Sequence, residues 1–429
     1  MTFRQRIRLD RLLAVPLCLV CDLLARGISR ILRRDHSIVP ATTRHVVVSK
    51  LVGIGSVIQA TPLLRSLKQN FPQARLTLVT LKANRPLADR LEGVDEVVCL
   101  DDSNAVAMLW TTANALANLI AKRVDHYFDL ELYSGFACLL SLFSLARNRF
   151  GFYRHSNRFK KGIYTHLVYF NTRMPVRKIY LQLGRVAGIP TGAEDQLGAL
   201  RIERSERASL KKKLTDLGLA ARQPYILINP NASDLLIERR WPEGHAVAAM
   251  TRLTQLGHSV VLLGANSEAA FVQNLVERVP AAVRGQIVNT AGQLTLGEAF
   301  ALIDGAACVL TNDTGPMHMA FALGRPTVCL FGPADPIHYG LNQPNIVTLY
   351  APVPCSPCLY EVDEPPCRGQ NICMQRLSPE LVVNHVLALL ARSGCKIPGA
   401  QSSSTSLPDS LPLIWDNEGG QPLGIALRP

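Results

Sequence analysis

The chain lacks the features that mark several common classes of protein. Aromatic residues make up only 6% of its 429 residues, and basic and aromatic residues are not interleaved as in many nucleic-acid-binding proteins. The apolar run at residues 12–25 is shorter than the ~20 residues that a membrane-spanning helix needs. A convincing Asp-x-Asp metal motif is absent, and the nearest match, at 129–131, reads as a strand end. These absences argue against nucleic-acid binding, a membrane span and a catalytic metal.

Positive charge is concentrated near the N-terminus. The formal net charge is +13, and the first 35 residues hold eight arginines but only three aspartates. Arginines flank the apolar run and no small-x-small cleavage site follows it, so a signal peptide is not indicated. We interpret residues 4–34 as an amphipathic helix that lies on the inner leaflet of a membrane. The alternative is a helix packed against the body of the protein.

The eleven cysteines fall into two groups. Seven are scattered, several of them within apolar runs, which is typical of reduced cysteines in a cytoplasmic protein. The other four lie close together, and the first two have the CxxC spacing of a zinc site: Cys355, Cys358, Cys367 and Cys373. We predict a structural zinc or another thiolate-bound metal there, with disulfides and free thiols as alternatives. A catalytic metal is not expected, because four cysteines leave no open coordination position.

Apolar runs alternate with helical patterns from residue 45 onwards. The runs predict strands at 46–48, 76–81, 97–100, 128–132, 225–228, 259–263, 287–288 and 308–310, and the periodicity predicts helices at 57–70, 296–303 and 316–323. A basic loop is expected at 147–161 and a charged connection at 211–223. Such alternation requires parallel sheets covered on both faces. We therefore predict an α/β protein with two domains facing across a cleft.

The densest motif is LTNDTGPMHMA at residues 310–320. It places Asp313, Thr314 and Gly315 on the turn between a buried strand and a helix, where open α/β sheets bind their ligands. Glycine lets the backbone approach a phosphate, and a carboxylate accepts sugar hydroxyls, so the turn suits a phosphorylated sugar. The alternative is an ordinary helix with Asp313 or Thr314 as its N-cap.

Several segments together resemble glycosyltransferase family 9, the bacterial heptosyltransferases and their relatives. They are KLVGIGS at 50–56 leading to ATPLL at 60–64, RRWP at 239–242, LLG at 262–264, NTAG at 289–292, NDTGPMH at 312–318 and FGP at 331–333. The resemblance implies the GT-B fold, with two Rossmann-like domains. We assign an acceptor domain to 41–205, a donor domain to 206–395 with a cysteine-rich insert at 355–373, a membrane-associating helix to 1–40 and a disordered tail to 396–429.

The resemblance also implies roles for residues of the donor domain. Asp313, Thr314, Gly315 and His318 are expected to contact the diphosphate and the sugar. Arg239, just before the Trp-Pro pair, is expected to neutralise the leaving diphosphate, in agreement with the chemistry of a bidentate guanidinium. The loop that follows the strand at 225–228 is expected to approach phosphate through Asn231 and Ser233, and Glu268 to hold the nucleoside ribose.

One departure from the family pattern concerns the catalytic base. The family usually has a carboxylate after the glycine of the N-terminal loop, where this chain has Ser56. A serine is no general base near neutral pH without a partner, so we expect it to cap the helix that starts there. Asp129 and Glu131 are then the candidates for a shifted base. Lys50, Gly53 and Gly55 are expected on the acceptor side. An acceptor that needs less help, or a relative without turnover, would also explain Ser56.

From the resemblance we predict an inverting, metal-independent glycosyltransferase without a catalytic cofactor. Its donor would be a nucleotide diphosphate sugar such as ADP-heptose, and its acceptor a lipopolysaccharide or another lipid-linked envelope glycan. It would work in the cytoplasm, peripherally on the inner face of the bacterial inner membrane, with no nucleic acid as partner. The alternatives are a non-catalytic sugar-nucleotide or glycolipid-binding relative and a GT-B-like sugar-nucleotide epimerase.

Overall fold

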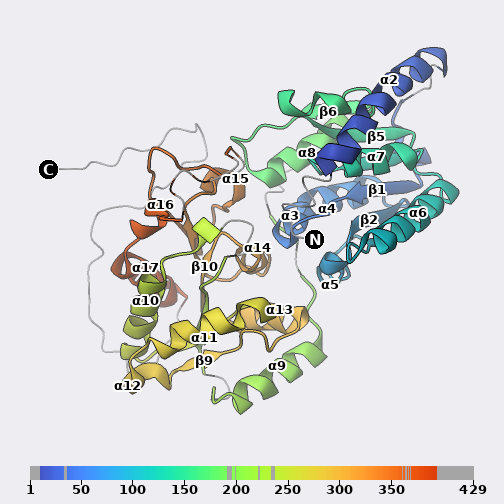
Figure 1. Ribbon diagram of the computed structural model, residues 1–429. Coiled ribbons are helices and arrows are strands. Elements are labelled where there is room, and N and C mark those ends of the chain that lie inside the picture. Colours follow the sequence, from blue (N-terminus) through green and yellow to red (C-terminus); the bar gives the residue numbers. More distant parts are fainter. Residues whose placement is uncertain are drawn as a thin grey trace. The chain divides into compact units, whose positions relative to one another are not determined.

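The chain divides into two compact units, Met1–Arg201 and Ile202–Pro429 (Figure 1). The computed structural model describes residues 10–32, 36–190, 196–198, 200–220, 223–232, 237–359, 361–362, 365, 367 and 369–393. Each unit contains one parallel six-stranded sheet covered by helices, which confirms the predicted α/β class. The predicted tail at 396–429 and the first residues of the predicted N-terminal helix lie outside the described residues.

The sheet of unit 1 has the strand order β3-β2-β1-β4-β5-β6, and all neighbouring strands are parallel. The carboxyl ends of its strands therefore share one edge, and the direction in which strands are added reverses between β1 and β4. Its elements are η1 (Asp10–Ala14), α2 (Val15–Leu32), η2 (Pro40–Thr42), β1 (His45–Ser49), α3 (Ile54–Gln59), α4 (Thr61–Asn70), β2 (Arg75–Leu81), η3 (Lys82–Asn84), α5 (Arg85–Ala88), β3 (Glu96–Leu100), α6 (Ala105–Ala121), β4 (His126–Asp129), α7 (Gly135–Phe143), β5 (Asn148–Tyr153), η4 (His155–Lys160), β6 (His166–Tyr169) and α8 (Val176–Val186).

The sheet of unit 2 has the order β12-β11-β10-β7-β8-β9 and is also parallel throughout. Its reversal point lies between β7 and β10. The elements are α9 (Arg204–Asp216), β7 (Tyr225–Asn229), η5 (Ile237–Arg239), α10 (Glu243–Gln255), β8 (Ser259–Leu262), η6 (Asn266–Glu268), α11 (Ala269–Glu277), α12 (Ala281–Arg284), β9 (Ile287–Asn289), α13 (Leu296–Gly305), β10 (Cys308–Asn312), α14 (Gly315–Ala322), β11 (Thr327–Phe331), α15 (Pro336–Tyr339), β12 (Ile346–Tyr350), α16 (Ile372–Gln375) and α17 (Pro379–Arg392).

Buried aliphatic strands form the core of each unit. In unit 1, Val47 and Tyr127 of the central strands pack with Leu119 of α6 and Leu140 of α7. In unit 2, the central strands pack against α10, α11 and α17 in one continuous cluster. Every residue of β1, β7 and β10 is buried, as expected for strands covered on both faces. These central strands fix the positions of the loops that follow them.

The predicted strands at 46–48, 76–81, 97–100, 225–228, 259–263, 287–288 and 308–310 are confirmed, with small shifts at their ends. The strand predicted at 128–132 ends earlier, at Asp129, because the chain turns there into the loop before α7. The helix predicted at 57–70 is broken at Ala60 into α3 and α4, since Pro62 lies in the first turn of α4 and cannot donate a main-chain hydrogen bond.

Two predicted connections are wrong. The basic loop predicted at 147–161 contains strand β5, in which Phe150, Gly151 and Phe152 are buried and Arg149 and Tyr153 are partly exposed. The sequence signal was masked by the basic residues on either side. The charged connection predicted at 211–223 is helical in its first part: α9 extends to Asp216, and it begins with a capping box formed by Glu203 and Glu206. Its polar surface reflects a helix with only Leu210 and Leu214 buried.

Candidate active site

The carboxyl edge of the unit 2 sheet holds most of the residues predicted to bind the donor. β7 and β10 are neighbours at the centre of this sheet, and strands are added outward from them in opposite directions. The loops that follow the two strands therefore diverge. The crevice between such diverging loops is where open α/β sheets bind ligands. Asp313 and Thr314 follow β10, and Asn231 follows β7.

Arg239 and Asp313 meet at this edge although 74 residues separate them. Arg239 ends η5, and its Nη1 donates to the main-chain oxygen of Asp313 at 2.8 Å and lies 3.7 Å from the carboxylate Oδ2. The two side chains are only 12% and 6% exposed. Burial raises the pKa of Asp313, although the guanidinium acts in the opposite direction. A guanidinium and a buried carboxylate thus share one small site.

Thr314 links the two central strands. Its hydroxyl accepts a hydrogen bond from Asn229 Nδ2 at 2.9 Å and donates to the main-chain oxygen of Asn312 at 3.3 Å. Thr314 is the N-cap residue of α14 by position, but no side chain caps this helix. Among the described residues, none accepts a hydrogen bond from the N–H of Gly315, the first residue of α14. An uncapped helix start of this kind suits an anion.

Of the other predicted donor residues, the structure describes Asn231, His318 and Glu268. Asn231 is 4% exposed, and its buried Oδ1 has no hydrogen-bond partner among the described residues. His318 is buried in α14, with its ring 6.5 Å from that of Tyr339. Glu268 ends η6 after β8, where its Oε2 accepts from the N–H of Ala265 at 2.8 Å. Ser233 lies outside the described residues.

The carboxyl edge of the unit 1 sheet carries a second cation–carboxylate pair. Lys50, directly after β1, and Glu131, two residues after β4, form an ion pair of 2.7 Å between Nζ and Oε1. The same oxygen accepts from the N–H groups of Leu51 and Val52 at 2.8 and 3.0 Å. Burial alone would raise the pKa of Glu131. The ion pair with Lys50 and the hydrogen bonds from the loop N–H groups outweigh burial, so the pKa lies below its ordinary value. No described residue donates to the other oxygen, Oε2, and the side chain is 12% exposed.

Asp129 is placed differently from Glu131. It is fully buried at the end of β4, where Oδ1 accepts from Ser49 Oγ and from the N–H of Glu131, both at 3.0 Å, and Oδ2 accepts from the Tyr164 hydroxyl. Burial raises the pKa of Asp129, against the influence of Lys160 and Tyr164. A carboxylate with both oxygens occupied and no exposed surface fits a role in holding the loop rather than in proton transfer.

The glycine-containing loop leads directly into α3. Gly53 is the N-cap of this helix at φ +90°, a conformation that favours glycine, while Gly55 and Ser56 lie within its first turn. The expectation that Ser56 caps the helix is therefore wrong: the helix starts three residues earlier than the apolar pattern indicates, and no side chain caps it. Ser56 remains half-buried beside Gly53.

The four clustered cysteines are free thiols in the structure. Burial raises the pKa of Cys373 to about 11, and the neighbouring thiols Cys358, Cys367 and Cys355 add to this. Among the described residues, no group of three His, Cys, Asp or Glu side chains is arranged to hold a metal ion. The predicted metal site stays a prediction.

The cysteine-rich segment also supplies a contact that sequence reasoning missed. Asn371 donates from Nδ2 to the main-chain oxygen of Arg240 at 2.7 Å and to that of Glu238 at 3.4 Å. It thereby holds the main-chain carbonyl groups of the two residues on either side of Arg239, and its own φ is +29°. Nothing in the sequence links residues so far apart; the one available signal is that asparagine tolerates positive φ better than most residues.

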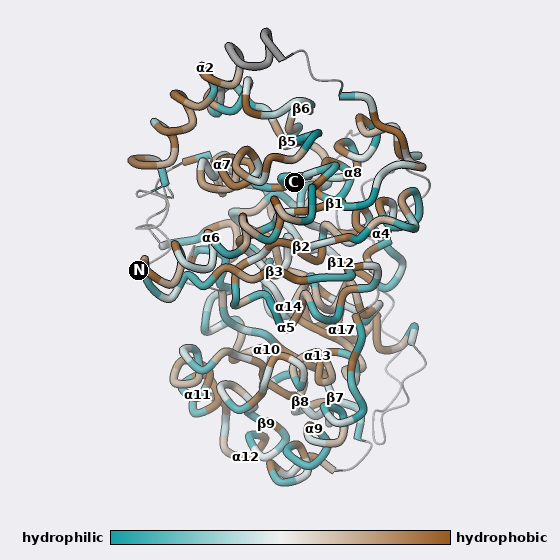
Figure 2. The backbone as a smooth tube through the Cα atoms, turned by 90° about the vertical axis from the view of Figure 1, so that its right-hand side faces the viewer, coloured by the Kyte–Doolittle hydropathy of each residue, from teal (hydrophilic) through white to brown (hydrophobic). Residues whose placement is uncertain are grey.

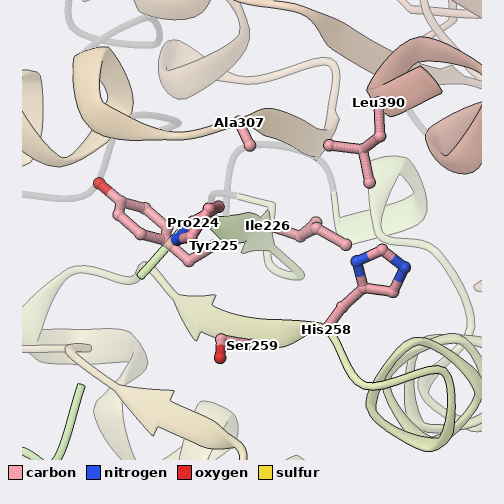
Figure 3. Close-up of a pocket in the computed structure, with 7 residues that line it drawn as sticks. All are labelled: Pro224, Tyr225, Ile226, His258, Ser259, Ala307 and Leu390. Atoms are coloured by element: carbon pink, nitrogen blue, oxygen red, sulfur yellow. The ribbon is translucent and has the colours of Figure 1, made fainter. Parts of the chain in front are cut away.

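The cavity in Figure 3 lies at the opposite edge of the unit 2 sheet, at the amino ends of its strands. Its volume is about 10 Å³, which is room for about one water molecule. It is therefore not a substrate site. The residues that line it are Pro224, Tyr225, Ile226, His258, Ser259, Ala307 and Leu390.

Comparison with known proteins decides which family these features represent. The model of glycosyltransferase family 9 (heptosyltransferase) matches residues 137–367, which is more than half of the chain. The chain belongs to glycosyltransferase family 9. It is a glycosyltransferase, and the sequence-based resemblance is confirmed. Neither the epimerase alternative nor the non-catalytic one receives support from this match.

Relatives and solved structures agree with the family. Lipopolysaccharide heptosyltransferase 2 of Salmonella typhimurium is 26% identical over 285 residues, covering 66% of this chain and 81% of the relative. A family 9 glycosyltransferase from Veillonella parvula aligns with a TM-score of 0.70 at 21% identity, over 83% of this chain and 99% of that one. ADP-heptose LPS heptosyltransferase II of Escherichia coli aligns with a TM-score of 0.67 at 21% identity, over 82% and 100%. These alignments confirm the GT-B-like fold.

Proposed function

We propose that this family 9 glycosyltransferase moves heptose or a related sugar from a nucleotide diphosphate donor to a lipopolysaccharide or another envelope glycan. The support for this is the family itself and the names of its relatives, a lipopolysaccharide heptosyltransferase and an ADP-heptose LPS heptosyltransferase. The reaction inverts the anomeric carbon and uses no metal ion. The acceptor is lipid-linked, and the protein works on the cytoplasmic face of the inner membrane.

The observation that carries the proposal is the Arg239–Asp313 contact at the reversal point of the unit 2 sheet. A nucleotide diphosphate gains negative charge as it leaves, and a fixed guanidinium stabilises that charge in the transition state. The uncapped start of α14 at Thr314 and Gly315 adds N–H groups and the positive end of the helix dipole. Asp313, Asn231 and His318 bind the sugar and diphosphate, and Glu268 holds the ribose.

On the acceptor side we assign the general base to Glu131. Lys50 and the loop N–H groups occupy only its Oε1, which leaves Oε2 to accept a proton. Because its pKa is lowered, the carboxylate is fully ionised at neutral pH. Asp129 and Ser49 hold the main chain around Glu131, so Asp129 is a positioning residue in this scheme. Ser56, Gly53 and Gly55 shape the loop that receives the acceptor.

The proposed step is a single displacement. The acceptor oxygen forms a bond with the anomeric carbon, and its proton passes to Glu131 Oε2. The bond between the anomeric carbon and the phosphate oxygen breaks, and the electron pair stays with the nucleotide diphosphate. Arg239 and the start of α14 receive that charge, which leaves no requirement for a divalent cation.

The donor is tested first by thermal shift of the purified protein with ADP-, GDP-, UDP- and TDP-sugars. We expect stabilisation by one nucleotide class, with ADP-heptose as the leading candidate, because a ligand that binds only the folded state raises Tm. Transfer is then followed with a core oligosaccharide acceptor in the presence of EDTA. Stabilisation by none of the donors, or activity that EDTA abolishes, would contradict the proposal.

The base assignment is tested with Glu131→Gln, which keeps the shape and the oxygen that accepts from the loop. We expect kcat to fall about 100-fold or more while the donor still stabilises the protein, since general-base catalysis contributes about 10²–10⁴. The matched control is Glu96→Gln, another partly buried carboxylate of unit 1 in a lysine pair. Full activity of Glu131→Gln would reject this assignment.

For the cysteine-rich segment we retain a structural zinc or another thiolate-bound metal as the proposal, supported by the CxxC spacing of Cys355 and Cys358 and by the nearby Cys367 and Cys373 in the sequence. Elemental analysis of the purified protein tests it, with a variant in which Cys355 and Cys358 are both replaced by serine as the reference. Absence of stoichiometric metal in the unaltered protein would reject it.

A further inference from the structure

Helix α2 differs from an ordinary surface helix, because its exposed side carries apolar residues and its buried side carries an acidic residue. Its exposed side, with that of the adjoining η1, is the apolar one: these residues are 46% to 71% exposed, namely Leu12, Leu13, Leu17, Leu19, Val20, Leu23 and Leu24. Figure 2 shows α2 as a largely hydrophobic segment. At 100° per residue these positions fall on one continuous face, here called the α2 outer face. An exposed aliphatic face of this size marks an interaction surface.

The inner side of the same segment carries its acidic residues. Asp10 accepts from the N–H groups of Gly135 and Phe136, both at 2.8 Å, and so caps α7. Asp22 accepts from the N–H of Gly162 and is 6% exposed. Cys18 is fully buried against Cys138 of α7. The segment is therefore docked on unit 1 by polar contacts and small side chains, while its large aliphatic side chains point away.

The sequence of the segment also has an excess of positive charge. The first 35 residues contain eight arginines, and Arg26 and Arg30 belong to α2 itself. Of the three aspartates in that stretch, Asp10 and Asp22 are turned inward to main-chain N–H groups. Apolar surface combined with excess positive charge matches a bilayer that contains anionic lipids. A protein interface would be expected to show aromatic residues instead, and the α2 outer face has none.

The described residues contain no helix that is long and apolar enough to cross a bilayer. A helix of 18 residues that lies in the plane of the interface needs no such length.

We propose that the α2 outer face docks on the surface of a bilayer rich in anionic phospholipid. Through Asp10, this docking holds the start of α7 at the same surface. The loop that carries Glu131 leads directly into α7, so the acceptor-side edge of unit 1 is kept beside the membrane. This last step rests on the proposed function, because it assumes that the acceptor is lipid-linked.

Flotation of the full chain with vesicles tests the docking without any substrate. We expect binding to vesicles of phosphatidylglycerol and phosphatidylethanolamine, and at least tenfold weaker binding to vesicles of phosphatidylcholine alone or at high salt. The double variant Val20→Glu and Leu24→Glu should lose at least tenfold of the binding to anionic vesicles. Both positions are more than half exposed, so the substitutions leave the core intact.

The matched control lies on α6, which also exposes aliphatic side chains. Val106 and Leu109 are 76% and 72% exposed, and their replacement by glutamate should leave vesicle binding unchanged. Three results would overturn the proposal: no vesicle binding by the unaltered chain, an equal loss in the α6 variant, or a dimer in size-exclusion chromatography that the α2 variant abolishes. The last would mean that a second copy covers this face.

A second readout separates this inference from the proposed function. The α2 variant should transfer sugar to a delipidated oligosaccharide acceptor at the unaltered rate, and at least tenfold more slowly to an acceptor embedded in vesicles. Loss of both activities would contradict the docking role. Absence of transfer by the unaltered chain to either acceptor would contradict the proposed function and leave the flotation result to decide the docking.

Discussion

The two units place the same kind of ion pair at equivalent points of their sheets, yet the pairs differ in tightness. In unit 1, a lysine after the first strand meets a carboxylate after the fourth, at 2.7 Å. In unit 2, an arginine after the first strand meets a carboxylate after the fourth, at 3.7 Å. Glu131 is saturated on one oxygen by three donors and its pKa is lowered; Asp313 is buried with fewer partners and its pKa is raised.

The difference teaches what each pair is for. A tight pair that also binds two loop N–H groups fixes the conformation of its loop before any ligand arrives. A loose pair leaves its cation close to a carboxylate that compensates it incompletely, which is how a site prepares for an anionic ligand. We therefore expect changes in the unit 2 pair to act mainly on catalysis and changes in the unit 1 cation to act mainly on stability.

The largest effect is expected from Arg239→Ala. In the proposed mechanism the guanidinium stabilises the leaving diphosphate, so its loss should lower kcat/KM for transfer about 100- to 1,000-fold. Arg278→Ala is the control, since Arg278 forms an exposed pair with Glu243 in the same unit and should leave kcat/KM unchanged. Steady-state kinetics measures both. A loss below tenfold for Arg239→Ala would remove it from the donor site and weaken the comparison.

Lys50→Met should act on stability. Both side chains of its pair are nearly buried, and removal of one partner leaves the carboxylate uncompensated, at a cost of about 3 kcal/mol in the free energy of unfolding. The control is Lys82→Met, whose pair with Asp101 lies at the surface and whose loss should barely change stability. Urea titration of both variants gives the answer. Equal stability of the two would show that the unit 1 pair is no tighter than a surface pair.

Asn371→Gly should produce a smaller and specific loss. Glycine keeps the positive φ but removes both hydrogen bonds to the peptide groups around Arg239. We expect KM for the donor to rise about tenfold with little change in Tm, which corresponds to the weakening of one to two hydrogen bonds. Asn345→Gly, which removes a comparable bond to Gly324 at the other end of the unit, is the control. Unchanged KM in Asn371→Gly would remove Asn371 as a positioning residue.

The smallest effect is a pair of opposite pH dependences. The folded-state pKa of Glu131 is below its ordinary value of 4.5, so its contribution to stability is present above pH 4.5 and is lost as pH falls through the lower value. The pKa of Asp313 is above its ordinary 3.8, so the cost of ionising it is relieved as pH falls through the raised value.

Denaturant titrations from pH 6 to pH 3 on Glu131→Gln and Asp313→Asn check the two signs. As pH falls, the free energy of unfolding of the unaltered chain should decrease relative to that of Glu131→Gln. Over the same range, the free energy of unfolding of the unaltered chain should increase relative to that of Asp313→Asn. Parallel curves for both variants would mean that the two carboxylates experience the same environment.

Most of the sheet architecture follows from the sequence, because buried parallel strands appear as short aliphatic runs such as those of β1 and β7. The turn at Asp313 is equally local, since the strand, the turn and the helix start are contiguous. The Lys50–Glu131 pair is not, because its members are 81 residues apart and meet only through the pairing of β1 with β4. The sequence pattern does not predict strand β5, which lies among basic residues, and it places the start of α3 too late. Both errors concern short elements, whose formation depends on packing against residues far away in the sequence.

The shared strand order has a consequence for how this protein can change. Each half of the chain supplies all six strands of its own sheet, and neither borrows a strand from the other. Recombination at the junction near Ile202 therefore exchanges whole hydrophobic cores without cutting any hydrogen-bonded ladder. If the proposed donor and acceptor roles are assigned to the two halves, a chimaera that takes its carboxyl half from a relative with a different sugar nucleotide should inherit that donor preference and keep the acceptor preference of its amino half.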